Sequence, residues 1–310
     1  MATSGSVNFS QDAESIVRDV LYASNSLSPG EDLEEHLSQM TIRCLNRMFK
    51  ALQSTGVLIW TYQEAYLFPN LTNNAYTIGE AGTAHFTDSA VITTLTAAAA
   101  SSATTLSLVS TGMTVGDYVG IELTAGTRQW TTIATIPGAT SITITDALTS
   151  AAASGNNVFT YTTKSKYPIS IPSVRYYDYS AALERPLQED ERSNYYDTPD
   201  KSISATTNMY FYDAGNQQTG TLNIFPLPDD IADYMKVTYE RQIQDIDSLS
   251  DSIDFPSQWY NAIIYMAAVD LSPFLRIKAD DDLRERAEYY YNKALRTNVE
   301  LDTKRTVVRG

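Results

Sequence analysis

The chain has 310 residues, of which 43% are hydrophobic, so it can bury the core of one large domain or of two ordinary ones. Its formal net charge of −15 argues against binding nucleic acid through the phosphates, because such binding needs clustered Lys and Arg. A single cysteine, Cys44, excludes an internal disulfide framework, and residues 1–10 lack the apolar stretch of a signal peptide. We therefore expect a soluble protein that is made in a cytoplasm.

Two amphipathic helices are predicted near the N-terminus. Ser10 is the expected cap of the first helix. Ser28-Pro29-Gly30-Glu31 combines a capping serine, a proline in the first turn and a glutamate three residues after the cap, which predicts the start of a second helix. That helix runs for roughly six turns and ends before Gly56. The apolar stripes of the two helices comprise Ala13, Ile16, Val17, Val20, Leu21, Leu33, Leu37, Met40, Cys44, Met48 and Leu52.

Two different β-rich regions follow the helices. Residues 57–68 are rich in aromatic and branched side chains and predict a strand. Residues 89–163 are mostly Thr, Ala, Ser, Ile, Val and Gly in short alternating segments, which predicts a small β-sandwich or barrel inserted into another domain. Within it, residues 103–108 resemble residues 139–144, and we interpret the pair as two similar strands. Residues 166–250 predict further short strands punctuated by proline.

A helix with no polar face is predicted after Pro256. Nearly every residue from Trp259 to Leu271 is apolar or aromatic, so the helix is either buried or spans a membrane. It is too short and too closely flanked by charge to span a bilayer, and it is therefore a central helix, packed by its own chain or by neighbouring copies. Three acids at residues 280–282 suit the start of a second helix, which carries Tyr290 on its apolar face, and a tail follows Thr297.

The sequence contains no metal-binding or catalytic motif that we recognise. His36 is expected on the exposed side of a helix and His85 in a glycine-rich loop, and neither has a catalytic partner at motif spacing. Cys44 is interpreted as a small core residue. Carboxylates are abundant enough to leave a glycosidase-like pair open. We expect no enzymatic activity, no cofactor and no metal.

Several short motifs occur in a fixed order along both ends and the middle of the chain. The motifs are Leu45-Asn46-Arg47-Met48, residues 51–60 ending in Trp60, Tyr76-Thr77-Ile78-Gly79, Arg185-Pro186, Tyr195-Tyr196, Pro199-Asp200-Lys201, Tyr210-Phe211-Tyr212, Leu222-Asn223-Ile224-Phe225-Pro226, Leu227-Pro228 and Phe255-Pro256 followed by Trp259. Their order resembles the head-to-tail adaptor family of short-tailed phages. The resemblance covers most of the chain but not residues 89–163, which look like an inserted β-domain.

The resemblance implies a helical core that assembles as a homo-oligomeric ring, usually of twelve copies, beneath the portal protein of the capsid. It also implies contact with a downstream tail nozzle, tube or fibre protein, passage of DNA through the channel without specific binding, and no membrane contact. The location implied is the head–tail junction of the virion, after synthesis in the host cytoplasm. The expected portal-binding residues of the tail are Lys304, Arg305, Val307, Val308 and Arg309, and the expected subunit-interface residues are Trp259, Tyr260, Ile263 and Tyr290.

The predicted fold class is α+β, with a helical core formed by the N-terminal and C-terminal helices, a β-rich middle and an inserted small all-β domain. The predicted segments are 1–88 (N-terminal helices and first strands), 89–165 (insertion), 166–250 (β-rich part of the core), 251–297 (C-terminal helical pair) and 298–310 (tail). The predicted function is a non-enzymatic adaptor ring that connects the portal to the tail, forms part of the DNA exit channel and closes the packaged head. Two alternatives stay open: a cell-wall-degrading tail component, and a host-binding or decoration protein that acts through the inserted β-domain.

Overall fold

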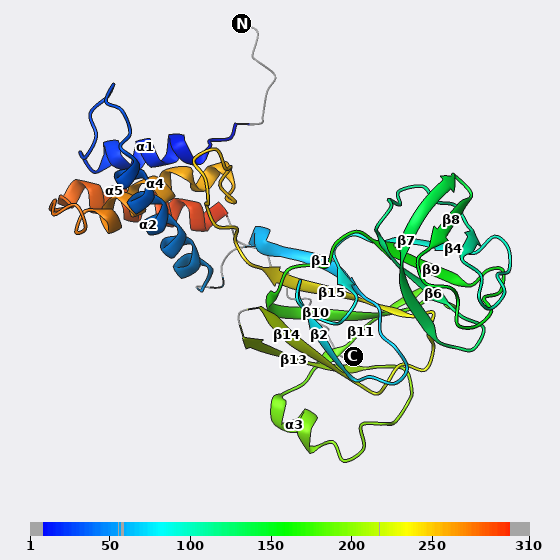
Figure 1. The fold of residues 1–310 in the computed structure, drawn as a ribbon. Coiled ribbons are helices and arrows are strands. Elements are labelled where there is room, and N and C mark those ends of the chain that lie inside the picture. The colour runs from blue at the N-terminus through cyan, green and yellow to red at the C-terminus, as the bar shows by residue number, and fades with distance from the viewer. Residues whose placement is uncertain (1–8, 55, 57–58, 217, 298–310) are drawn as a thin grey trace, which may run out of the picture. The chain divides into compact units, whose positions relative to one another are not determined.

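The computed structural model describes residues 9–54, 56, 59–216 and 218–297, and the chain divides into two compact units (Figure 1). The described residues up to Thr61 and from Ile243 onward form a helical unit, and the described residues between 62 and 242 form a β unit. The described residues contain both helices and several sheets, which confirms the predicted α+β class.

The helical unit is built around the apolar helix that the sequence predicts. Its elements are α1 (Ala13–Ala23), α2 (Glu35–Gln53), the 3-10 turns η1 (Ile59–Thr61) and η2 (Ser257–Trp259), α4 (Tyr260–Leu271) and α5 (Asp281–Thr297). Helix α4 contacts α1, α2 and α5. Because it is surrounded on several sides, only Asn261 and Asp270 among its residues are exposed.

The starts of the first two helices differ from their prediction. Gly30 adopts a left-handed φ of +93°, which an α-helix cannot contain, so Ser28 to Glu31 form a turn. In that turn the Glu31 carboxylate accepts a hydrogen bond from the Ser28 amide at 2.7 Å, and α2 begins only at Glu35. Helix α1 is capped by Asp12 and not by Ser10, because the Asp12 carboxylate accepts from the Ser15 amide at 2.9 Å.

The core of the β unit is a sandwich of two sheets. One sheet has the order β11-β10-β15-β1-β3, and the other has the order β12-β13-β14-β2. Apolar side chains from both sheets form one buried cluster, as expected for sheets packed face to face. The elements are β1 (Tyr62–Leu67), β2 (Ala75–Ile78), β3 (Phe86–Thr87), β10 (Pro168–Asp178), β11 (Leu183–Pro186), β12 (Gln188–Glu189), the short helix α3 (Arg192–Asp197), β13 (Met209–Asn216), β14 (Thr219–Phe225) and β15 (Tyr234–Arg241).

A six-stranded antiparallel sheet is inserted between β3 and β10 and has the order β4-β9-β6-β7-β8-β5. An isolated bridge between Leu95 and Leu108 joins its two ends, so the sheet closes into a small barrel. The two similar segments of the sequence are paired neighbours, in which Leu106 faces Ile142 and both are fully buried. Its strands are β4 (Val91–Thr94), β5 (Thr105–Ser107), β6 (Tyr118–Glu122), β7 (Arg128–Gly138), β8 (Ser141–Ile144) and β9 (Asn157–Tyr161).

Two further expectations need correction. The strand predicted over residues 57–68 begins only at Tyr62, since residues 59–61 form a 3-10 turn. The prediction that one helical core organises the chain is not confirmed. The buried apolar side chains fall into separate clusters in the helical unit, the sandwich and the barrel, because each layer buries its own apolar face.

Candidate protein-interaction site

The motifs at the two ends of the chain meet in an aromatic cluster of the helical unit. The Trp60 ring lies 5.4 Å from Phe255 and 5.3 Å from Trp259, measured between ring centroids. Phe49 of α2 lies 4.6 Å from Phe255. Tilted aromatic pairs at these separations are favourable beyond the area that they bury. The cluster therefore joins the end of the N-terminal helical segment to the start of α4.

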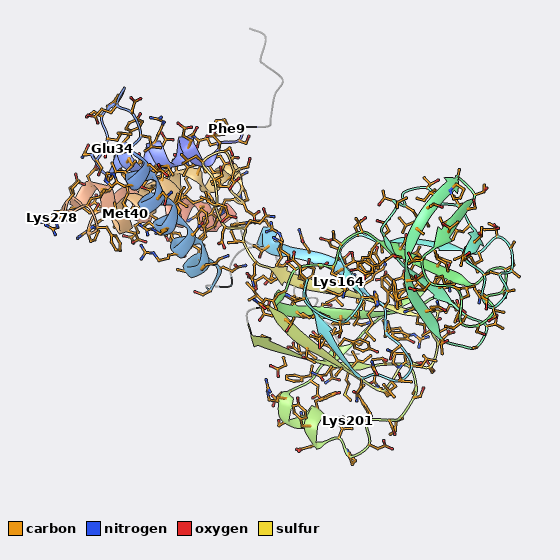
Figure 2. All side chains as sticks on the ribbon, in the orientation of Figure 1. Phe9, Glu34, Met40, Lys164, Lys201 and Lys278 are labelled. Atoms are coloured by element: carbon orange, nitrogen blue, oxygen red, sulfur yellow. The ribbon has the colours of Figure 1, made fainter. Side chains whose placement is uncertain are left out.

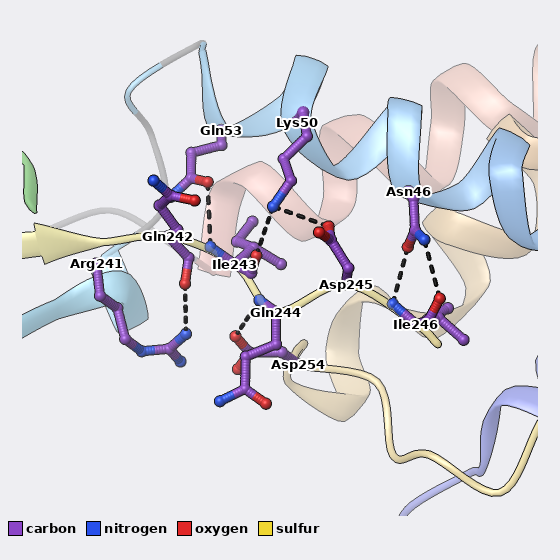
Figure 3. A network of polar contacts seen from close by, with 10 residues as sticks. All are labelled: Asn46, Lys50, Gln53, Arg241, Gln242, Ile243, Gln244, Asp245, Ile246 and Asp254. Atoms are coloured by element: carbon purple, nitrogen blue, oxygen red, sulfur yellow. Dashed lines mark hydrogen bonds and ion pairs between the residues drawn. The ribbon is translucent and has the colours of Figure 1, made fainter. Parts of the chain in front are cut away.

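Polar side chains of α2 hold the chain where it returns to the helical unit (Figure 3). The Asn46 side chain makes two hydrogen bonds with the backbone of Ile246: it donates to the carbonyl at 3.0 Å and accepts from the amide at 2.9 Å. Gln53 accepts from the Ile243 amide at 3.1 Å. Lys50 donates to the Ile243 carbonyl at 2.8 Å and forms an ion pair with Asp245, also at 2.8 Å. These contacts satisfy backbone groups of a segment that lies outside any sheet.

A surface pocket of about 320 Å³ lies beside this region, between α2 and the end of α4. Its lining residues are Cys44, Arg47, Met48, Ala51, Asp270 and Phe274. The Arg47 guanidinium lies 4.9 Å from the centroid of the Phe274 ring, at the distance of a cation–π contact. The pocket therefore combines an apolar floor with one positive and one negative side chain.

Two titratable groups of this pocket have shifted pKa values. Burial raises the pKa of the Cys44 thiol, and the Asp270 carboxylate raises it further, so the thiol stays protonated and weakly nucleophilic. Partial burial also raises the pKa of Asp270, and the Arg47 charge opposes that shift. Cys44 is 3% exposed within the helical core, which confirms its interpretation as a core residue.

Exposed apolar side chains occur at the pocket and on the segments that follow α4. Phe274 is 55% exposed and Ile277 is 38% exposed, and both belong to the connection between α4 and α5, which also carries Lys278 (Figure 2). Tyr289 on α5 is exposed as well. Large apolar side chains that remain in water next to one another are typical of a protein-contact surface. We define the contact surface as Phe274, Ile277 and the pocket beside them.

The predicted interface residues lie elsewhere. Trp259, Tyr260 and Ile263 are buried inside their own chain, so a subunit folded in this way leaves little of their surface for a neighbour, and their role at a subunit interface stays a prediction. Tyr290 is half-buried and stacks on Tyr265 with ring centroids 5.2 Å apart. The sequence predicted an apolar surface shared with a neighbour, whereas the chain itself covers most of α4. The predicted portal-binding residues lie outside the described residues: Lys304, Arg305, Val307, Val308 and Arg309.

A second group of perturbed side chains lies where the barrel meets the sandwich. Arg128, from β7, donates to the backbone carbonyls of Pro69 at 2.9 Å and Asp233 at 3.3 Å, and also to the carbonyl of Ile231. Its guanidinium lies 4.5 Å from the centroid of the Phe159 ring. Burial lowers the pKa of Arg128 to about 10. Sequence reasoning missed this residue, although it is the one cation between residues 89 and 163.

His85 connects the sandwich to the barrel. Its ring stacks on Trp130 of β7, with centroids 3.6 Å apart and planes inclined by 7°, and its Nδ1 lies 2.7 Å from the hydroxyl of Tyr161. Burial lowers the pKa of the imidazole to about 3, and the charges of Lys164 and Arg128 contribute to the same shift. The ring is therefore neutral near pH 7 and is held on three sides by packing, as a structural residue would be. His36 is exposed, as predicted.

The comparisons with known proteins give no identification: no protein-family model matches the chain, and no curated protein matches it. Within the described part of the chain, no three His, Cys, Asp or Glu side chains are grouped so that they could hold a metal ion. The helices of that part are all too short or too polar to cross a membrane.

Proposed function

We propose that this protein is a structural adaptor that forms a ring between the portal and the tail of a short-tailed phage, without enzymatic activity. The ring would line part of the DNA exit channel and close the packaged head. The proposal places the protein in the virion, at the head–tail junction. Its partners are further copies of the chain, the portal protein and a downstream tail protein.

The observation that supports this proposal most is the spatial clustering of the motifs that carry the family resemblance. Trp60, Phe255 and Trp259 come from motifs far apart in the sequence and lie within one aromatic cluster. Motif residues Asn46 and Gln53 bind the returning backbone. In the sandwich, Tyr76 of the β2 motif pairs with Leu222 of the β14 motif. Leu222 in turn pairs with Tyr212 of the β13 motif. The motifs of the helical unit therefore pack against one another, and so do the motifs of the sandwich, which is a stronger match than the same motifs scattered over unrelated surfaces.

The contact surface of the helical unit gives the ring its candidate interface. Phe274 and Ile277 are apolar and keep 55% and 38% of their surface exposed in the single chain, so burial of that remaining surface against a neighbour would contribute roughly 0.5–1.5 kcal/mol for each side chain. This surface offers a neighbour more exposed area than Trp259, Tyr260 and Ile263 do, because those three side chains are already buried.

The mass of the purified protein, measured by native mass spectrometry with and without its portal protein, tests the proposal. We expect a ring of many copies that joins the portal. Phe274→Asp should prevent ring formation, while Val115→Asp, which likewise introduces an aspartate at an exposed apolar residue but in the barrel, should not. A protein that remains a single chain in both conditions would refute the proposal. Digestion of peptidoglycan by the purified protein would refute the absence of enzymatic activity.

The C-terminal tail is the proposed portal-binding segment. Removal of residues 298–310, which include Lys304, Arg305 and Arg309, should leave a folded protein that no longer joins the portal. Circular dichroism checks the fold of the truncated chain, and co-sedimentation with portal rings checks binding. Binding that is unchanged by the truncation would contradict this role of the tail.

The barrel supports a second candidate function, attachment to a host or to another virion surface. Arg128 fixes the barrel to the sandwich through three backbone carbonyls, so the barrel is a firmly held module and not a loose loop. Deletion of residues 89–163 discriminates between the two functions. Particles that keep their tails but fail to adsorb to cells would favour attachment, and particles without tails would favour the adaptor function.

A further inference from the structure

A second cavity lies at the junction of the barrel and the sandwich. It has a volume of about 260 Å³ and is lined by side chains of both parts, including Asn70, Asn73, Tyr76, His85, Arg128 and Trp130. Sites for drug-sized ligands start near about 300 Å³, so this cavity suits a smaller molecule. All of these residues belong to the β unit.

The cavity contains a cation that no carboxylate contacts. Among the described residues, Arg128 makes no ion pair, and the nearest acids, Glu122, Asp233 and Asp230, act on it only through their longer-range fields. A guanidinium has five N–H donors. Three hydrogen bonds to carbonyls are formed, and the buried Nε has no acceptor. The Nε is enclosed by protein, but one N–H of the Nη groups also makes no hydrogen bond to a carbonyl, and the half-buried residue has no counter-ion in the described part of the chain. An anion in the cavity would offset the cost of this charge and accept from that N–H.

The polar groups at the mouth of the cavity are also donors. The side-chain oxygen of Asn70 already accepts from the amides of Thr72 at 3.2 Å and Asn73 at 2.8 Å, so its NH₂ group remains for a ligand. The Tyr76 hydroxyl is already used, because it accepts from the Asn70 amide at 3.1 Å and donates to the Asn73 carbonyl at 2.6 Å. The NH₂ group of Asn73, which is an exposed residue, forms no hydrogen bond within the described part of the chain.

This arrangement specifies the chemistry of a ligand. A single guanidinium is balanced by a single negative charge, which a carboxylate carries and a phosphate dianion exceeds. Two carboxamide NH₂ groups at the rim are suited to hydroxyl oxygens. We propose that the cavity binds a small hydroxylated monocarboxylate of the size of one sugar acid, with its carboxylate toward Arg128 and its hydroxyl groups toward Asn70 and Asn73. The proposal is independent of ring formation and concerns only the β unit.

Trp130 supplies the readout, because it lines the cavity and is the single tryptophan of the β unit, whereas Trp60 and Trp259 belong to the helical unit. The full chain is labelled with 5-fluorotryptophan and titrated by ¹⁹F NMR with glucuronate, glucose, acetate and phosphate. We expect a saturable shift of the Trp130 line with glucuronate, binding at least about tenfold weaker for acetate, and no shift with glucose. The lines of Trp60 and Trp259 should not move.

A charge change at the rim tests the position of the ligand without disturbing the contacts of Arg128. Asn73→Asp keeps the backbone contacts of residue 73 and should weaken glucuronate binding by about tenfold or more through repulsion. Asn292→Asp makes the same change at an exposed residue of α5 and should leave binding unaltered. The proposal is overturned if glucuronate gives no saturable shift, if phosphate or glucose binds as well as glucuronate, or if Asn73→Asp binds glucuronate like the unmodified chain.

Discussion

Acidification should destabilise the β unit through His85. In the folded chain this imidazole stacks on Trp130, binds the Tyr161 hydroxyl and has a pKa of about 3. In the unfolded chain it recovers an ordinary pKa of about 6.5. The unfolded state therefore binds a proton more readily than the folded state at any pH between these two values.

The sign and size of the effect follow from this difference. Because protons favour the unfolded state, the free energy of unfolding falls as the pH falls from just above 6.5 toward 3, and each pH unit in that window costs about 1.4 kcal/mol. Between about pH 7.5 and pH 5.5 the loss due to His85 is about 1.4 kcal/mol. Domains are commonly stable by only about 5–15 kcal/mol, so the loss is measurable.

Urea unfolding followed by ¹⁹F NMR measures the free energy of unfolding of the β unit separately from that of the helical unit. The Trp130 line reports the β unit, while Trp60 and Trp259 report the helical unit, which does not contain His85. Separate reporters are needed because a chain with two compact units need not unfold in one step. The free energy of unfolding from the Trp130 line should fall by about 1.4 kcal/mol more than in a control without the imidazole.

The control is the double variant His85→Phe with Tyr161→Phe. It keeps the aromatic stack and removes the titrating group together with its hydrogen-bond partner, so no buried hydroxyl is left unpaired. Burial raises the pKa of Asp233, so the contribution of this acid to the stability of the folded chain is lost as the pH rises, which is the opposite sign to the effect of His85. The double variant retains Asp233, so the comparison cancels its contribution. Equal pH dependence of the unmodified chain and the double variant would refute the reasoning.

Three further predictions concern packing, backbone space and capping. Trp259→Ala should lower the stability of the helical unit by about 3–5 kcal/mol in urea unfolding followed by the Trp60 line, and a loss below about 1 kcal/mol would contradict its burial. Gly82→Ala should destabilise the β unit in a thermal melt, because its new Cβ would lie 2.3 Å from the Thr77 carbonyl oxygen, whereas Gly138→Ala, which meets open space, should leave the melt unchanged. Asp280→Ala should destabilise α5 by about 1 kcal/mol, measured by amide hydrogen exchange, since Asp280 accepts from the Leu283 amide at 2.7 Å; unchanged exchange in the first turn would show that the cap contributes nothing.

The sequence alone was sufficient to predict those helices and strands whose buried face follows from the local spacing of apolar residues. The stripe of α1 from Ala13 to Leu21 is buried, and the uniform apolarity of α4 corresponds to a helix with neighbours on several sides. The similarity of residues 103–108 and 139–144 corresponds to two paired strands of the barrel. In each case the side-chain period follows from helix or strand geometry alone, so the sequence is sufficient.

Tertiary structure decided what depends on partners far away in the chain. The signal at Ser28 became a turn because Gly30 took a left-handed conformation, and α4 proved to be covered by its own chain. Arg128 looked like an isolated charge, yet its three acceptors are carbonyls of loops 59, 103 and 105 residues away. No periodicity encodes such contacts, because they arise only when separate layers pack and a buried cation must find acceptors. The cavity at that junction is therefore a property of the folded chain and not of any motif.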